Sequence, residues 1–334
     1  MIPAAPRRMV APLSEPSGSA PSPPQAPAES LAPLPRWLRP QPAHVLVAEQ
    51  AIFAAGGAIA WLDQVVRLDV PVLGALRMRQ ALSAAVISAE RLRLRADAAT
   101  LRDAEHLTRP GDDPGPAGRL HRAWRRMAEQ PTRTDATSVA HLASLLDVGI
   151  PTTEAVAVRA SEPGSFPVAA AAAAAGRVIR SGAGPSRERE IVAWMIADLV
   201  LAAHLGWSRP IPLLATAIRH PFLRPAGEGR WPAPDSPAWL PFCCAAYAQA
   251  ATAAYERAGE LLRRAAQLRQ AITRVRSRGR EDGAALLLAD DAIAPARLAA
   301  IGSDRAARRF LERLTALGAV RELTGRPIFR LYGL

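Results

Sequence analysis

Arginine side chains recur along the segment 304–317 with a spacing that places them together on one side of a helix. Its apolar residues follow i, i+3, i+4, i+7 spacing and form one stripe: Ala307, Phe310, Leu311, Leu314 and Leu317. The opposite face carries Arg305, Arg308, Arg309, Glu312 and Arg313. A guanidinium is a planar fork that donates paired hydrogen bonds to phosphates and guanine edges. The pattern predicts a recognition helix that reads DNA, although a solvated helix surface often has the same arginine content.

The residues around this helix predict a winged helix-turn-helix. A short apolar helix is expected at 295–301, and Ser303 can cap the recognition helix that follows. Gly318 stands where a left-handed C-cap belongs, and two short strands are expected at 320–323 and 328–331. The hairpin adds three arginines that could touch the phosphate backbone: Arg321, Arg326 and Arg330.

A second basic stretch lies just before this module. A long helix is expected from about Pro237 to Arg276, and the segment 261–280 contains no Asp or Glu. Arg274 and Arg276 could therefore lie along DNA phosphates beside the recognition helix. A solvated surface or a contact with an acidic partner would have the same composition.

Paired carboxylates occur in the loop 108–118, at Asp112 and Asp113. Two adjacent carboxylates can bind a cation or act as an acid and a base. Asp beside Gly and Pro is also typical of turns and helix caps. The loop is expected to be structural, with a metal site at Asp112 and Asp113 as the weaker alternative.

The segment 220–230 reads His-Pro-Phe-Leu-Arg-Pro-Ala-Gly-Glu-Gly-Arg and resembles the active loop of Fic-family nucleotidyl transferases. The resemblance implies that His220 is a general base and that Arg230 follows a glycine-rich phosphate cradle. The segment is two residues longer than the family pattern, and Glu228 stands where the family has Asn. Because a cradle depends on the positions of backbone N–H groups, two extra residues would displace it. An active transferase, a degenerate relative and a coincidental match all remain open.

Composition and charge favour a helical protein with an anionic partner. The 334 residues are rich in Ala and Leu, and only 5% are aromatic. The formal net charge is +12, which favours nucleic acid first and anionic lipid second. All basic residues are Arg and there is no Lys or Asn, a skew that is typical of a GC-rich genome. The arginine count by itself is therefore a weaker argument than the net charge.

Cysteine usage and hydropathy are consistent with a cytoplasmic protein. Cys243 and Cys244 are adjacent and form no disulfide framework, so they are expected to be buried thiols. The segment 191–205 is the most apolar, but it is interrupted by Asp198 and is too short to span a membrane. No cofactor motif is recognised, and the sequence is not expected to encode a membrane protein.

The expected fold is mainly α: a multi-helix N-terminal bundle followed by a C-terminal winged helix-turn-helix with a small β-hairpin. Residues 1–42, which are rich in Pro, Ser and Ala, are expected to form a disordered tail. A helical domain would cover 43–235, a long basic connecting helix 236–280, and the winged helix 281–334.

Two family resemblances accompany this interpretation. Residues 304–314 (Asp-Arg-Ala-Ala-Arg-Arg-Phe-Leu-Glu-Arg-Leu) and 317–326 resemble the C-terminal winged helix of many Fic-family proteins. Nearly everything after the first forty or so residues resembles a bacterial family, often seen in rhizobia and relatives, that is described by a domain of unknown function, DUF1403. The segments 101–104 and 109–119 and the tail 318–334 carry that resemblance. It implies a family and no activity.

The function expected from these observations is DNA binding, as a regulator or an accessory factor of a plasmid or mobile element, with a homodimer possible. One alternative is a divergent or degenerate Fic-like transferase that works around His220, Glu228 and Arg230. Another is a helical scaffold that binds proteins and whose winged helix only packs.

Overall fold

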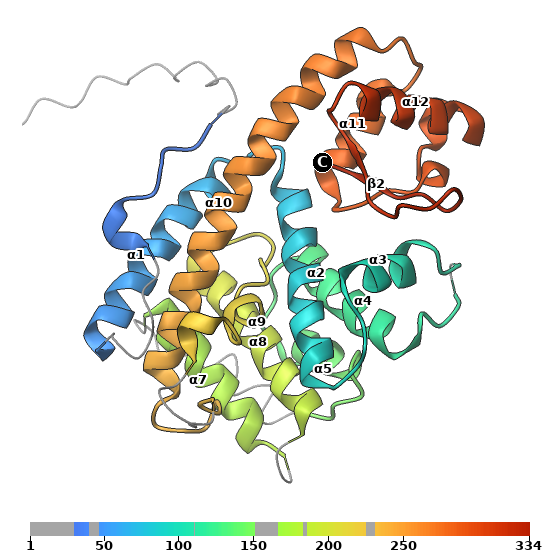
Figure 1. Cartoon of the computed structure of the whole chain (residues 1–334). Helices are drawn as coiled ribbons and strands as arrows, with labels where there is room; N and C mark the ends of the chain where they lie inside the picture. Colours follow the sequence, from blue (N-terminus) through green and yellow to red (C-terminus); the bar gives the residue numbers. More distant parts are fainter. Residues whose placement is uncertain (1–29, 40–46, 110, 151–165, 183–185, 225–230) are drawn as a thin grey trace, which may run out of the picture.

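The structure is a computed structural model that describes residues 30–39, 47–109, 111–150, 166–182, 186–224 and 231–334. These ranges are mainly helical, as expected, with one small antiparallel hairpin (Figure 1). The α-helices are α1 (Ala48–Arg67), α2 (Leu73–Arg91), α3 (Ala98–His106), α4 (Gly115–Glu129), α5 (Ala136–Ser144), α7 (Pro167–Arg180), α8 (Arg187–Leu205), α9 (Leu214–Ala217), α10 (Trp239–Arg274), α11 (Arg280–Ala289) and α12 (Asp304–Ala316). The strands are β1 (Arg321–Glu322) and β2 (Tyr332–Gly333).

The 36-residue helix α10 runs through the bundle and extends to the C-terminal residues (Figure 1). Small residues dominate its buried side, so α1 packs closely along it. The predicted span, from about Pro237 to Arg276, is correct to within two residues at each end. Cys243 and Cys244 lie on this helix as buried free thiols, which confirms that prediction. Burial raises the pKa of the Cys244 thiol to about 11.

Helix α8 is buried nearly all round and packs against α7. Its Asp198 is fully buried and accepts hydrogen bonds from the backbone N–H of Leu213 (2.8 Å) and of Leu214 (3.1 Å). The hydroxyl of Tyr247 donates a third hydrogen bond to the same carboxylate, at 3.0 Å. Asp198 therefore holds the start of α9 against the core. Helix α9 begins only after Pro210 and Pro212, which have no N–H to donate.

Helices α2, α3 and α4 pack together, and α2 also contacts α11 near the C-terminus. The buried Trp124 indole donates to the Ser88 hydroxyl at 3.0 Å and so joins α4 to α2. At the far end of α2, Gly74 lies so close to α11 that a Cβ atom there would be 2.7 Å from the backbone of Ala289. Only glycine permits this approach of the two helices.

Residues 280–334, named the C-terminal module below, contain α11, two 3₁₀ turns, α12 and the hairpin. In the hairpin, Glu322 of β1 pairs with Tyr332 of β2. Tyr332 also forms an isolated β-bridge with Ile293, so it lies between Ile293 and Glu322. The apolar helix expected at 295–301 is wrong: the structure has only the 3₁₀ turns Pro295–Arg297 and Ala299–Ile301. The strand expected at 328–331 is also wrong: β2 is Tyr332–Gly333, and residues 328–331 precede it.

Several expectations fall at the edges of the described residues. Residues 30–39 belong to the expected disordered tail, yet they form a 3₁₀ turn (Arg36–Leu38) whose Leu38 is buried. Residues 1–29 of the expected tail lie outside the described residues, as do residues 151–165. Within the part of the chain that the structure describes, no helix is long and apolar enough to cross a membrane.

Candidate nucleic-acid interface and the ion network behind it

The expected recognition helix is α12. Its Ser303 hydroxyl accepts a hydrogen bond from the N–H of Ala306 at 3.3 Å, as the sequence predicts for an N-cap. Gly318 follows the helix with φ +72°, the left-handed conformation that was expected there. The apolar stripe is inserted into the module, with Ala307, Phe310, Leu311 and Leu314 all buried. Leu317, which was expected to complete the stripe, is 44% exposed.

The arginine face of α12 points to solvent. The side chains on this face are exposed: Arg305, Arg308, Arg309 and Arg313. Arg308 forms an ion pair with Asp304 at 2.7 Å. The other three form no ion pair or hydrogen bond through their side chains to any described residue. Their N–H groups are therefore free to donate to a partner.

The three hairpin arginines differ in their partners within the protein. Arg321 is exposed and has no ion-pair partner among the described residues. Arg326 forms an ion pair with Asp103 of α3. Arg330 donates from Nε to the carbonyl of Arg326 at 2.9 Å and lies 3.8 Å from a carboxylate oxygen of Glu312. The hairpin loop is thus held against α3, and Arg326 is already neutralised by the protein itself.

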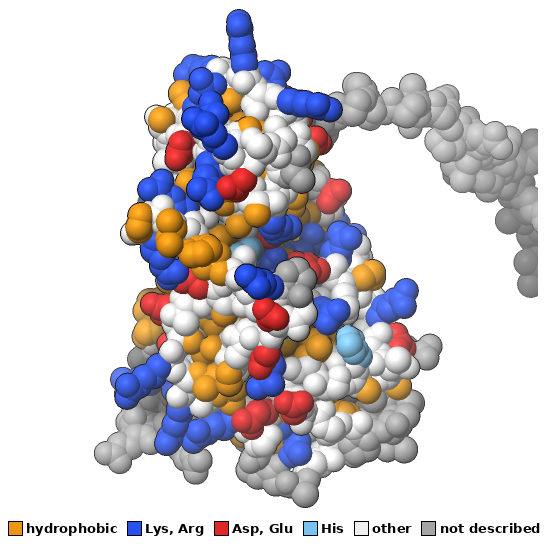
Figure 2. Space-filling view, turned by 90° about the vertical axis from the view of Figure 1, so that its right-hand side faces the viewer, with side chains coloured by type: hydrophobic (Ala, Val, Ile, Leu, Met, Phe, Trp, Pro, Cys, Tyr) orange, Lys and Arg blue, Asp and Glu red, His pale blue; other side chains and the backbone are white. Residues whose placement is uncertain are grey.

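The end of α10 lies beside the C-terminal module, and its last turn contributes the exposed Arg274. Arg276 follows and is also exposed. Figure 2 shows basic side chains gathered on the upper half of this face, where Figure 1 places the end of α10 and the C-terminal module. The second basic stretch expected from the sequence is therefore close to α12.

A buried ion network joins the module to α3 and α4, and sequence reasoning missed it. Arg125 of α4 donates to both carboxylate oxygens of Asp290, at 2.8 Å and 2.9 Å, and to Asp291 at 3.1 Å. Arg102 of α3 donates to Asp291 at 2.8 Å, and Arg297 donates to Asp290 at 2.6 Å. The only sequence signal was the adjacent carboxylate pair that follows the apolar helix α11.

The opposite charges in this network keep Asp291 and Arg125 ionised although both are buried. Burial alone would raise the pKa of Asp291, but His106, Arg125 and Arg102 hold it well below its ordinary value. Burial alone would lower the pKa of Arg125, but its hydrogen bonds with Asp290 and the charges of Asp290 and Asp291 raise that pKa above its ordinary value. The network is therefore a set of permanent ion pairs across the junction.

Three residues at this junction have side chains that can bind a metal ion: His106, Asp290 and Asp291. Their potential ligand atoms lie within 4.8 Å of one another. Arginine groups already occupy the oxygens of both carboxylates. A divalent cation would have to displace these donors and remain beside the guanidinium of Arg125. The arrangement therefore fits an ion-pair junction and does not fit a metal centre.

The expected alternative metal site lies elsewhere. Asp112 and Asp113 are both exposed, and Asp113 accepts a hydrogen bond from the N–H of Gly115 at 3.0 Å at the start of α4. The guanidinium of Arg119 is 3.9 Å from the same carboxylate. These contacts give Asp113 the role of a turn residue.

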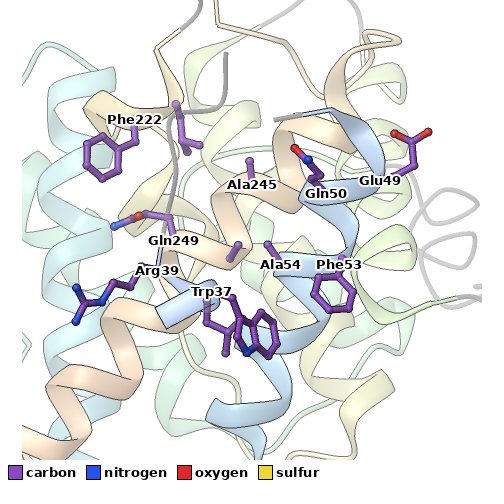
Figure 3. A pocket seen from close by; sticks show the side chains of 12 residues that line it. Trp37, Arg39, Glu49, Gln50, Phe53, Ala54, Phe222, Ala245 and Gln249 are labelled. Atoms are coloured by element: carbon purple, nitrogen blue, oxygen red, sulfur yellow. The ribbon is translucent and has the colours of Figure 1, made fainter. Parts of the chain in front are cut away.

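The described part of the Fic-like segment consists of His220 and its neighbours, whereas Glu228 and Arg230 lie outside the described residues. His220 accepts a hydrogen bond at Nδ1 from the N–H of Phe222 at 3.3 Å, and burial lowers its pKa. Phe222 lines a cavity of about 650 Å³ together with Trp37 and Phe53, whose ring centroids are 5.3 Å apart (Figure 3). The His220 ring is thus used to start a short turn beside an aromatic pocket.

Comparison with known proteins gives a family and no precedent for the chemistry. No curated protein matches this chain. The model of the family described as "Protein of unknown function (DUF1403)" matches residues 25–334, which is most of the chain. The protein therefore belongs to the DUF1403 family.

Proposed function

We propose that this protein binds double-stranded nucleic acid through the exposed arginine face of α12. Three arginines carry the proposal: Arg305, Arg309 and Arg313 have no side-chain partner among the described residues. A guanidinium without an internal partner is available to phosphates and to guanine edges in the major groove. The face is not covered by the helical bundle, which argues against a module that serves only for packing.

The order of elements in the C-terminal module supports the same proposal. Helix α11, the bridge residue Ile293, two 3₁₀ turns, α12, β1, a loop and β2 follow one another along the chain. That is the order of a winged helix-turn-helix in which the second helix is reduced to 3₁₀ turns, and α12 would enter the major groove.

The charges beside α12 would hold the backbone of the nucleic acid. Arg274 and Arg276 at the end of α10 and Arg321 on the hairpin are exposed. Arg326 is paired with Asp103, so it is assigned to the fold and not to the nucleic acid. The net charge of +12 would add long-range attraction.

The test is selection from random and genomic DNA fragments by the full chain over a salt series. Enrichment of particular sequences with an affinity that falls steeply with salt is the expected result. Binding without enrichment would reduce the proposal to non-specific attraction. No binding at low salt would refute it.

A further inference from the structure

A cavity of about 580 Å³ lies at the junction between the C-terminal module and the helical bundle. His106 and Leu107 at the end of α3 form one side. Helix α12 forms another with Asp304, Arg308 and Glu312, and Arg308 is paired with Asp304 at 2.7 Å. The hairpin loop closes it with Phe329 and Arg330. Its size is in the range of pockets that hold small organic molecules. This junction faces the viewer in Figure 2, where hydrophobic and charged side chains lie side by side.

Arg330 provides the cavity with an oriented cation. Its Nε donates to the carbonyl of Arg326 at 2.9 Å, which fixes the direction of the guanidinium. Glu312, which also lines the cavity, forms an ion pair with this guanidinium: its carboxylate oxygen is 3.8 Å from Nη1, which is too long for a hydrogen bond. Among the described residues nothing accepts a hydrogen bond from the two terminal nitrogens. These two nitrogens can donate paired hydrogen bonds to a ligand carboxylate that displaces Glu312 from the longer contact.

The hairpin loop gives the cavity an apolar side. Ile328 and Phe329 line the cavity, yet these two residues are 63% and 66% exposed. Phe329 also has φ +55°, a left-handed conformation that is strained for an aromatic residue. The backbone thus keeps an aromatic ring at the edge of the cavity and leaves it largely uncovered. An apolar body bound there would remove this surface from water.

We infer that this cavity binds a small organic carboxylate with an aromatic body, held by Arg330 at its charged end and by Phe329 at its apolar end. The ligand would touch α3 and α12 at once, through His106 and Arg308, and would fix α12 relative to the bundle. Control of nucleic-acid binding by this ligand rests on the function proposed above. Binding of the carboxylate itself does not.

The experiment titrates the full chain with benzoate, phenylacetate and 3-phenylpropanoate, followed by ligand-observed NMR and calorimetry. One-to-one binding is expected for at least one of them, with about tenfold weaker binding of the matching uncharged amide. Arg330→Gln is expected to weaken binding by about tenfold. Arg321→Gln removes an arginine of the same hairpin that does not line the cavity, and it should bind like the parent.

Phe329→Gly tests the apolar end without risk to the fold, because glycine adopts φ +55° freely. This variant should keep its thermal stability and lose affinity for the carboxylate. Failure of all three carboxylates to bind at millimolar concentration, or equal binding by Arg330→Gln, would overturn the site. If a carboxylate binds but leaves DNA affinity unchanged, the regulatory part is wrong. If a carboxylate binds and DNA does not, the function fails and the site stands.

Discussion

Arg125 Nη1 and Nη2 donate to Asp290 Oδ1 and Oδ2, at 2.8 Å and 2.9 Å, and so tie α4 to the C-terminal module. The two residues are 165 positions apart in the chain. Both side chains are more than nine-tenths buried, so the bond is shielded from solvent and salt. The module that carries the arginine face is therefore fixed to the bundle by charge as well as by packing.

Arg125→Met should destabilise this junction. The substitution removes the buried counter-charge that Asp290 and Asp291 share, and breaking a buried ion pair in this way typically costs about 3–5 kcal/mol. Urea unfolding should show the loss, and hydrogen exchange should increase in residues 280–334. Arg126→Met, at the exposed neighbouring position, is the matched control and should change stability by less than about 0.5 kcal/mol. Equal effects of the two variants would contradict the account.

His121 should make the fold sensitive to mild acid. Its Nδ1 is 3.0 Å from the Leu101 carbonyl, so it donates as a neutral ring, and burial lowers its pKa to about 4. The unfolded pKa is about 6.5, so the neutral histidine's full contribution is present above that pH and is lost progressively down to about pH 4. The loss is expected to total about 3 kcal/mol. His121→Gln should flatten the stability curve over this window, and a slope identical to the parent's would disprove the assignment.

Gly74→Ala should separate α2 from α11. A Cβ atom would meet the Ala289 backbone at 2.7 Å, and overpacking of this kind costs about 1–3 kcal/mol. Gly56→Ala on α1 is the control, because nothing lies within 4 Å of a Cβ there. That variant should gain about 0.5–1 kcal/mol from helix propensity. Thermal unfolding of both proteins measures the difference, and a stabilised Gly74→Ala protein would argue against the close contact.

Local patterns predicted the local elements of this fold well. Ser303, the apolar stripe of α12 and Gly318 act within one helix, so their spacing was enough to place them. The segment 295–301 misled because a proline start and apolar content do not distinguish a helix from two 3₁₀ turns. The ion network could not be predicted, because Arg125 and Asp290 meet only through the packing of α2, α4 and α11.

The partners of the hairpin arginines also depend on tertiary packing and could not be predicted from the sequence. Its arginines have the composition of a wing, but the position of Asp103 on α3 decides that Arg326 is paired inside the protein. That contact joins residues 223 positions apart, and no periodicity in the sequence reports it.

Replacing Arg274 and Arg276 by Gln should mainly reduce the salt dependence of DNA binding. Both side chains would touch phosphates and not bases, so affinity should fall for all sequences alike. The slope of log affinity against log salt should decrease by about 2, one for each lost phosphate contact. Fluorescence anisotropy with specific and unrelated duplexes measures both slopes. A loss confined to the specific duplex would assign these residues to base reading instead.

The most direct test removes the unpaired arginines of α12 and compares the variant with a protein of equal charge. Arg305, Arg309 and Arg313 are changed to Gln in one protein, and the exposed Arg95, Arg126 and Arg219 in the other. If α12 reads DNA, the first variant should lose about 1–3 kcal/mol of specific binding per base-contacting arginine, while the control keeps its sequence preference. Equal affinity and equal preference in the two variants would contradict the proposal that this face binds nucleic acid.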